Sequence, residues 1–440
     1  MNELAGKREH FDYRGQGEAS FEPDGIVAFA QRLVQPLLTI AVLFFCFHLW
    51  RVGEVNVTLS DTMFILVVVI ELGLGHLNGR PFRDLTPVWL ASLLVMLGGL
   101  LVGSWLNGDP VRWLIVAAQY MFSYMLLPMV LIRERTMLER MVVALIIGLT
   151  AMESLGILVY YTFDHVQATE TFGRDFLTGG QRLGAMVGDA NWNSAVIAMA
   201  LPFTMYAAIR RLIPPGAALV AAAVLCWALM LAASFTGFCA AMLSMSAMAV
   251  AAGIRPSPKI LLLAGALIVG LYASGYQMPQ IFAKRVALAL QTGDLDSAGT
   301  YDDRADLLAE AWEHAEHTAI IGMGVDQYRK FSAHGQPVHN MYVLLLAEGG
   351  IVAVAGWIGV LLSLVFIPLS RLRRHRVEAA LCLSTIMVFQ VFTLASPHMY
   401  ARLWMVPVFM SVGLVLTADR SPVGGRPVRR KGSTAQPRVR

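Results

Sequence analysis

The segment from His334 to Gly350, HGQPVHNMYVLLLAEGG, places a histidine and an asparagine directly before a long apolar run. A histidine side chain has an ordinary pKa of about 6.5, so near neutral pH it can take a proton from a hydroxyl group. His339 is therefore a candidate general base. A lone histidine at the start of a helix can also be a capping or rim group, and this segment alone leaves both roles open.

Two arginines lie close to other apolar runs. Arg182 and Asp189 precede one run, and Asn191 stands in its first turn. Asp189 or Asn191 can cap a helix there by accepting a backbone N–H. The planar fork of the Arg182 guanidinium suits a phosphate or diphosphate group, with a rim salt bridge as the alternative. Arg304 lies beside several aspartates, so an ion pair is its first interpretation from the residues alone; they are Asp302, Asp303 and Asp306.

The composition indicates a membrane protein that must hold these side chains at its surface. Hydrophobic residues make up 57% of the chain and charged residues only 15%, against an apolar share of ~45–50% in soluble domains. The charges gather between apolar runs long enough to cross ~30 Å of hydrocarbon as helices. We therefore expect an all-α polytopic protein with about twelve spans. The expected spans are residues 32–50, 59–75, 85–105, 112–132, 141–161, 191–211, 216–233, 236–254, 259–276, 341–368, 377–396 and 402–418.

The distribution of basic residues sets the expected topology. Most of the 34 lysines and arginines fall in alternate connections, which predicts that both termini lie in the cytoplasm. Residues 1–31 form a cytoplasmic segment without a cleavable signal, and residues 32–418 form the transmembrane domain. The basic tail 419–440 is expected to be disordered and to act as a cytoplasmic anchor, and its charge suits anionic lipid headgroups. Residues 162–190, 277–340 and 396–400 are expected outside.

The loop 277–340, between the ninth and tenth expected spans, is too long to be a plain connector, so it is expected to hold short helices and a function. Its segment DRADLLAEAWEHAEHT has apolar residues at helical spacing, namely Leu307, Leu308, Ala311 and Trp312. This pattern predicts an amphipathic helix lying on the membrane surface. Arg304 stands at the start of that helix.

Motifs for several other chemistries are absent from the sequence. There is no Gly-x-x-x-x-Gly-Lys phosphate loop, no His-Glu-x-x-His, no Cys-x-x-Cys and no Asp-rich metal loop in the expected external segments. ATP-driven transport and metal-dependent hydrolysis therefore lack their usual sequence evidence. The four cysteines all fall within expected spans, where each acts as a small apolar residue. We expect neither a metal nor a cofactor.

Three blocks of the sequence resemble the O-antigen ligase and polymerase superfamily of bacterial inner-membrane glycan transferases. The first block matches the family's Arg, helix-start Asn and Leu-Pro at Arg182, Asn191, Leu201 and Pro202. The second is similar to its Arg, Trp, Gly-x-Gly and aromatic pattern at Arg304, Trp312, Gly322, Gly324 and Tyr328. The third resembles its His-Asn and Glu-Gly at His339, Asn340, Glu348 and Gly349. Together the blocks cover residues 180–360.

The resemblance implies transfer of a glycan from undecaprenyl diphosphate to an acceptor hydroxyl on the periplasmic face of the inner membrane. In this interpretation His339 is the general base, and substrate is bound by Arg182, Arg304, Asn191, Asn340 and Tyr328. A ligase would use lipid A–core or a similar acceptor, whereas a polymerase would use another lipid-linked glycan. Membrane lipids surround the protein, and no nucleic acid is involved.

One segment departs from the family pattern. Many members have Ser-Arg-Gly at the outer end of the span after the Asn helix, whereas this chain reads AASFTGFCAAM, with Ser234, Thr236 and Gly237 but no arginine. The missing cation shifts the expected diphosphate binding to Arg182 and Arg304, with Arg285 or Arg402 as further candidates.

Two other classes of function remain alternatives. A transporter or flippase would use charged groups within its spans, for which the candidates are Glu71, Glu153 and Glu348. A non-catalytic scaffold of an envelope complex would need none of the site residues.

Overall fold

The computed structural model describes residues 23–50, 57–254, 278–293, 299, 301–397 and 399–420. Its described part is almost entirely helical, with one two-stranded antiparallel sheet. The long or apolar helices are α1 (Pro23–Leu43), α2 (Leu59–Gly73), α3 (Thr86–Asn107), α4 (Pro110–Tyr120) with the π-helix η2 (Met121–Leu126) and α5 (Leu127–Leu131), α6 (Arg135–Thr162), α8 (Ala190–Ile209), α9 (Pro215–Ala232), α10 (Phe235–Ala252), α16 (Met341–Arg371), α17 (Arg376–Thr393) and α18 (Arg402–Thr417).

The remaining elements are short or lie between these helices. They are η1 (Arg83–Leu85), α7 (His165–Phe172), β1 (Leu177–Thr178), β2 (Arg182–Leu183), η3 (Ala185–Val187), α12 (Gln280–Phe282), the π-helix η4 (Ala283–Ala287), α13 (Leu288–Thr292), α14 (Tyr301–Thr318), α15 (Tyr328–Phe331) and η6 (Ala418–Arg420). The expected short helices of the loop 277–340 are thus present as α12 to α15.

Among the described residues, eight helices are long and apolar enough to cross a membrane, so the protein is an all-α polytopic membrane protein. Each expected span except 259–276 overlaps a helix, and 259–276 lies outside the described residues. The count of twelve stays a prediction because α1, α2 and α18 are not among these eight helices. In α2 the carboxylates Asp61 and Glu71 stand near its two ends and are both buried in ion pairs.

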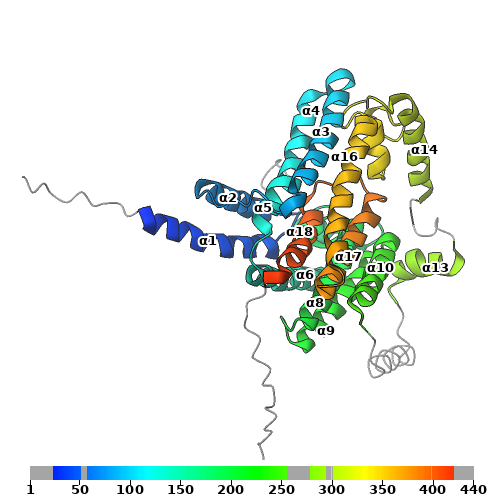
Figure 1. The fold of residues 1–440 in the computed structure, drawn as a ribbon. Coiled ribbons are helices and arrows are strands. Elements are labelled where there is room, and N and C mark those ends of the chain that lie inside the picture. The colour runs from blue at the N-terminus through cyan, green and yellow to red at the C-terminus, as the bar shows by residue number, and fades with distance from the viewer. Residues whose placement is uncertain are drawn as a thin grey trace, which may run out of the picture.

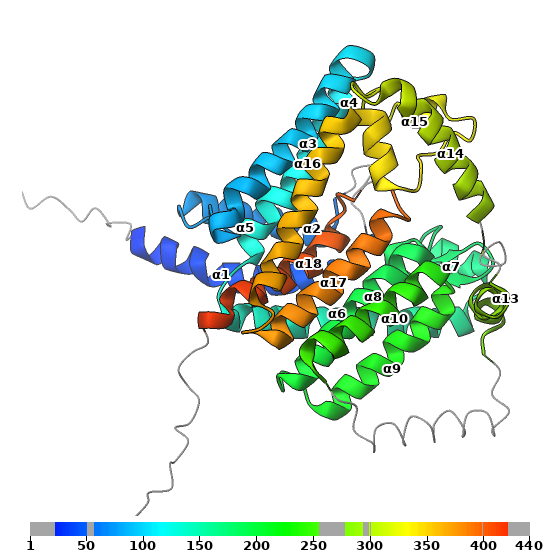
Figure 2. The same cartoon turned by 45° about the vertical axis from the view of Figure 1, so that its right-hand side comes forward.

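The helices form two packed groups that meet where α16 packs on α17 and along α18, which contacts both. Figures 1 and 2 show α3, α4 and α16 together in one group and α8, α9, α10 and α17 in the other. Helix α18 lies between them and is buried along nearly its whole length. Its Trp404 and Phe409 are fully buried and meet aromatic side chains of both groups, including Trp192 and Trp89. This burial of aromatic surface fixes the two groups against each other.

Helix α16 is broken at Gly350, where φ is 68° and ψ is −173°. The backbone groups released by the break pair with the preceding loop: Ile351 N–H donates to the Ala319 carbonyl at 2.7 Å, and Met323 N–H donates to the Ala347 carbonyl at 2.9 Å. Gly324 N–H donates to the Glu348 carbonyl at 2.9 Å. The loop therefore satisfies the polar groups of the break, as buried backbone requires.

Two glycines permit this close approach. A Cβ on Gly322 would lie 2.1 Å from the Glu348 carbonyl, and one on Gly350 would lie 2.6 Å from the Ile320 carbonyl oxygen. Gly350 also has a positive φ, which side chains disfavour. The break separates the first turns of α16, which follow His339, from the long apolar part of the helix.

Helix α14 forms at the predicted place. Leu307 and Ala311 are buried, and Ala311 packs into a small core with Tyr328 and Leu344, which joins α14 to α16. Leu308 and Trp312 lie next to them on the same face of the helix and are 38% and 54% exposed. Part of the apolar face therefore packs within the protein, and its place at a membrane surface stays a prediction.

Candidate functional site

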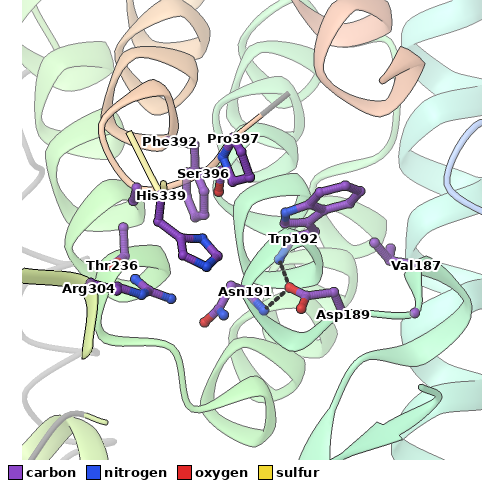
Figure 3. A pocket seen from close by; sticks show the side chains of 12 residues that line it. Val187, Asp189, Asn191, Trp192, Thr236, Arg304, His339, Phe392, Ser396 and Pro397 are labelled. Atoms are coloured by element: carbon purple, nitrogen blue, oxygen red, sulfur yellow. Dashed lines mark hydrogen bonds between the residues drawn. The ribbon is translucent and has the colours of Figure 1, made fainter. Parts of the chain in front are cut away.

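A polar cavity of about 300 Å³ lies where the turn before α8, the start of α10, the start of α14, the residue before α16 and the end of α17 meet. Asn191, Arg304 and His339 all line it, although they are far apart in the sequence. Figure 3 shows the His339 ring and the Arg304 guanidinium pointing into the cavity toward Asn191. The structure thus brings together three of the residues that the sequence singles out.

His339 is held from both sides by buried neighbours. Val338 and Met341 are each 1% exposed, whereas His339 itself is only half-buried. Asn340 is the N-cap of α16, because its Oδ1 accepts the backbone N–H of Tyr342 at 3.0 Å and of Val343 at 3.2 Å. The capping role that was one explanation for His339 therefore belongs to Asn340. His339 faces the cavity at a height fixed by the helix start.

Arg182 is positioned by a tight hairpin and held by neutral acceptors. Strands β1 and β2 pair Thr178 with Arg182 across a turn in which Gly180 has φ 76°. The Arg182 Nε donates to the Ala232 carbonyl at 3.0 Å, and Nη2 donates to Asn191 Oδ1 at 2.8 Å. Both acceptors orient the guanidinium without neutralising its charge.

The start of α8 divides capping and binding between two residues. Asp189 Oδ1 accepts the backbone N–H groups of Asn191 and Trp192, each at 2.8 Å, so Asp189 is the N-cap. The Asn191 side chain is then available for Arg182. One turn in, Asn193 Nδ2 lies 3.3 Å from both Glu153 Oε2 and the Leu183 carbonyl, which ties β2 and α6 to α8.

The charges around Arg182 favour the binding of an anion. Burial, together with the nearby charges of Arg285 and Arg304, lowers the pKa of Arg182 to about 10, although Asp189 acts in the opposite direction. Arg182 is still protonated at neutral pH. Its pKa is lowered first by burial and then by the charges of Arg285 and Arg304, and a bound anion would offset both effects.

The segment that lacks the family arginine still forms part of the site. Ser234 caps α10 by accepting the Gly237 N–H at 3.2 Å, and Thr236 lines the cavity. Gly237 packs directly on Ser194, since a Cβ there would lie 2.0 Å from its Oγ. The position before Gly237 thus offers a hydroxyl to the cavity in place of a guanidinium.

Of the predicted binding residues, Arg182 and Asn340 do not line this cavity themselves, and two further candidates, Tyr328 and Arg402, lie elsewhere. Tyr328 is fully buried, and its hydroxyl lies 3.1 Å from both the Leu307 carbonyl and Glu310 Oε2. Its visible role is to hold α15 against α14, and it is not among the residues that line the cavity. Arg402 forms an ion pair with Asp61, with Nε at 2.6 Å from Oδ1 and a second contact through Nη2.

Four residues of the cavity wall were not predicted from the sequence. Trp192, Phe392, Ser396 and Pro397 also line it. The short turn at 396–400 was expected on the outer side, but its proximity to His339 has no sequence signal, because α17 meets the start of α16 only through tertiary packing.

Within the described ranges, no group of three or more His, Cys, Asp or Glu side chains is arranged to hold a metal ion. No family model matches the chain, and no curated protein matches it significantly. The resemblance to the O-antigen ligase superfamily therefore rests on the residues quoted above.

Proposed function

We propose that the protein is an O-antigen ligase-like glycan transferase that moves a glycan from undecaprenyl diphosphate to an acceptor such as lipid A–core. The observation that supports this most strongly is the convergence of His339, Arg304 and Asn191 around one cavity, with Arg182 hydrogen-bonded to the Asn191 side chain. The proposed reaction needs a base for the acceptor hydroxyl and cations for the departing diphosphate. In the proposal the site faces the periplasm, and both termini lie in the cytoplasm.

The proposed chemistry assigns a step to each group. His339 takes the proton of the acceptor hydroxyl while that oxygen attacks the anomeric carbon of the glycan. The bond from the anomeric carbon to the diphosphate oxygen breaks, and its electron pair leaves with the lipid diphosphate. Arg182 and Arg304 stabilise the charge that grows on this leaving group. Asn191 keeps the Arg182 fork in orientation. No nucleotide is needed because the diphosphate linkage supplies the driving force.

The alternative of a transporter finds less support in the membrane carboxylates. Glu71 pairs with Arg133 at 3.0 Å, and Glu153 accepts a hydrogen bond from Asn193 at 3.3 Å. Glu348 accepts backbone N–H groups of Asp326 and Tyr328, which belong to the loop paired with the α16 break. Each of these carboxylates connects two segments of the fold, a structural use that accounts for its burial.

The test is the glycan phenotype of a deletion strain, complemented with the wild-type protein or with His339→Gln. Loss of a ligase leaves full-length chains on the carrier lipid, and loss of a polymerase leaves single units or short chains on lipid A. We expect the wild type to restore the normal glycan and His339→Gln, expressed at the same level, to fail. Full restoration by His339→Gln would reject the transferase proposal in favour of a scaffold or transporter.

A further inference from the structure

A second cavity, of about 230 Å³, adjoins the polar one. The two share Arg304, His339 and Ala395 as a common wall. Beyond that wall the second cavity is lined by Asn340 and by four apolar residues, which are Ala305, Leu308, Val338 and Leu394. A polar and an apolar compartment thus meet at the guanidinium and the imidazole to which the proposed function gives the chemistry.

We propose that this apolar cavity binds the first isoprene units of the lipid carrier, next to its diphosphate. The inference rests on the proposed function and deepens it, because it gives each part of the donor a place. The donor changes from polar to apolar at one bond, the bond between its diphosphate and its prenyl chain. Arg304 stands at the corresponding boundary in the protein, where a cation can contact the diphosphate from the edge of an apolar compartment.

Exposed apolar side chains extend this compartment. Leu394 is 59% exposed at the end of α17, and Leu308 and Trp312 lie one turn apart on α14, beside its buried residues Leu307 and Ala311. The indole N–H of Trp312 donates to Glu316 at 3.1 Å, so the polar atom of the ring is satisfied. A branched hydrocarbon chain that leaves the cavity along these three side chains would cover apolar surface that is otherwise exposed.

The arrangement also explains why the apolar face of α14 is only partly buried. Ala311 packs in the small core that joins α14 to α16, which sets the position of Arg304 in the first turn of α14. Leu308 and Trp312 are not needed for that contact. Continuity with the polar cavity, through Arg304 and His339, makes the prenyl chain of the same donor the occupant that fits this side.

The kinetic test compares two donors that carry the same glycan diphosphate, one on undecaprenol and one on an ethyl group. The readout is the ratio of kcat/KM for the long donor to that for the short one. We expect Leu308→Ser and Leu394→Ser each to lower this ratio ~10-fold, because each loses apolar contact with the chain alone. Val166→Ser is the matched control, since Val166 is 62% exposed on α7 and lies outside both cavities. Equal effects on both donors, or the same drop in the control, would overturn the inference.

A second measurement reads the lipid site without turnover. A prenyl diphosphate with a benzophenone on its first isoprene units, and no glycan, is photolysed with the full-length protein, and the labelled peptides are identified. We expect labelling near Leu308 or Leu394 that excess undecaprenyl diphosphate suppresses. Labelling confined to the separate groove of Ile65 and Phe122 would contradict the inference. If the wild type fails to transfer glycan but is labelled at Leu308, the proposed reaction falls while the lipid site stands.

Discussion

Two arginines that are predicted to lie on the same side of the membrane are held in opposite ways. Arg402 faces a carboxylate, that of Asp61, through both Nε and Nη2. Arg182 instead donates to the carbonyl of Ala232 and the amide oxygen of Asn191. A carboxylate partner neutralises a guanidinium, whereas neutral oxygens orient it and leave its charge for a ligand. The contrast indicates that Arg402 stabilises the fold and that Arg182 is placed to bind an anion.

The surroundings of the two side chains agree with this difference. Asp61 also forms a capping box with Thr58 at the start of α2, so the pair with Arg402 connects α2 to α18. Arg182 lies near two further arginines, Arg285 and Arg304, which with burial lower its pKa. Of the two arginines suggested as substitutes for the missing family arginine, Arg402 already serves a structural contact, and Arg285 lies close enough to act on Arg182.

The largest effect is expected at the base itself. His339→Gln should lower the transfer rate by ~10²-fold or more, the usual scale for a positioned general base. Its thermal stability should stay close to that of the wild type, because Asn340 and not His339 caps α16. Purified variants are assayed for transfer and for thermal midpoint together. A variant that is inactive only because it unfolds would remove the catalytic assignment.

The next largest effect is expected at Arg182 and distinguishes it from Arg402. Arg182→Lys should lower kcat/KM by about 10- to 100-fold, because an ammonium cannot keep the two directed contacts of the fork and bind an anion as well. Arg304→Lys should behave in the same way. Arg402→Lys is the matched control and should lose stability while it keeps most of its turnover. Equal turnover in the wild type and Arg182→Lys would reduce Arg182 to an ordinary rim charge.

Asp61→Asn should affect stability rather than transfer. The Arg402 and Asp61 side chains are 15% and 5% exposed. Removing the Asp61 charge leaves the buried Arg402 guanidinium without this carboxylate. We expect a loss of about 2–3 kcal/mol in the free energy of unfolding, read from denaturant titration in detergent. Asp84→Asn, at an exposed carboxylate in η1, should be near neutral. A silent Asp61→Asn change would mean that the pair does not stabilise the fold.

Gly350→Ala should disturb the break in α16. The added Cβ would lie 2.6 Å from the Ile320 carbonyl oxygen at a residue with φ 68°, which we expect to lower stability by roughly 1–3 kcal/mol. Transfer should fall too, because the break positions the turns that follow His339. Gly98→Ala, in the interior of α3 with nothing near its Cβ, should instead be neutral or stabilising. Matching results for the two glycines would show that the break is unimportant.

The smallest effect is expected at the cap. Asn340→Ala removes the acceptor for two backbone N–H groups, which should cost about 1 kcal/mol of stability. Transfer should fall less than in His339→Gln, because the imidazole itself remains. The comparison uses the same thermal and transfer assays. A rate loss as large as that of His339→Gln would move Asn340 from a positioning role into direct contact with substrate.

Local signals predicted much of this architecture. Hydropathy located the helices, because each apolar run is continuous in sequence, and residue type identified Asp189 as a possible cap. The break at Gly350 escaped prediction, since it depends on backbone pairing with Ala319 and Met323 in a preceding loop. The aspartates beside Arg304 suggest an ion pair, which stays a prediction, and only the folded chain shows that its guanidinium points into a cavity with His339. The contact between Arg402 and Asp61 joins residues 341 positions apart, beyond the reach of any local pattern.

The most direct test measures glycan transfer from undecaprenyl diphosphate to an acceptor in vesicles that contain the purified protein, with a chelator and without ion gradients. Wild type, Arg182→Lys and Arg402→Lys are assayed side by side, and release of the lipid diphosphate is followed with the product. We expect the wild type to release one diphosphate per glycan transferred, Arg182→Lys to be slow in both, and Arg402→Lys to approach the wild type. Absence of transfer by the wild type, or equal losses in the two lysine variants, would contradict the proposal that this cavity is a glycan-transfer site with Arg182 at the diphosphate.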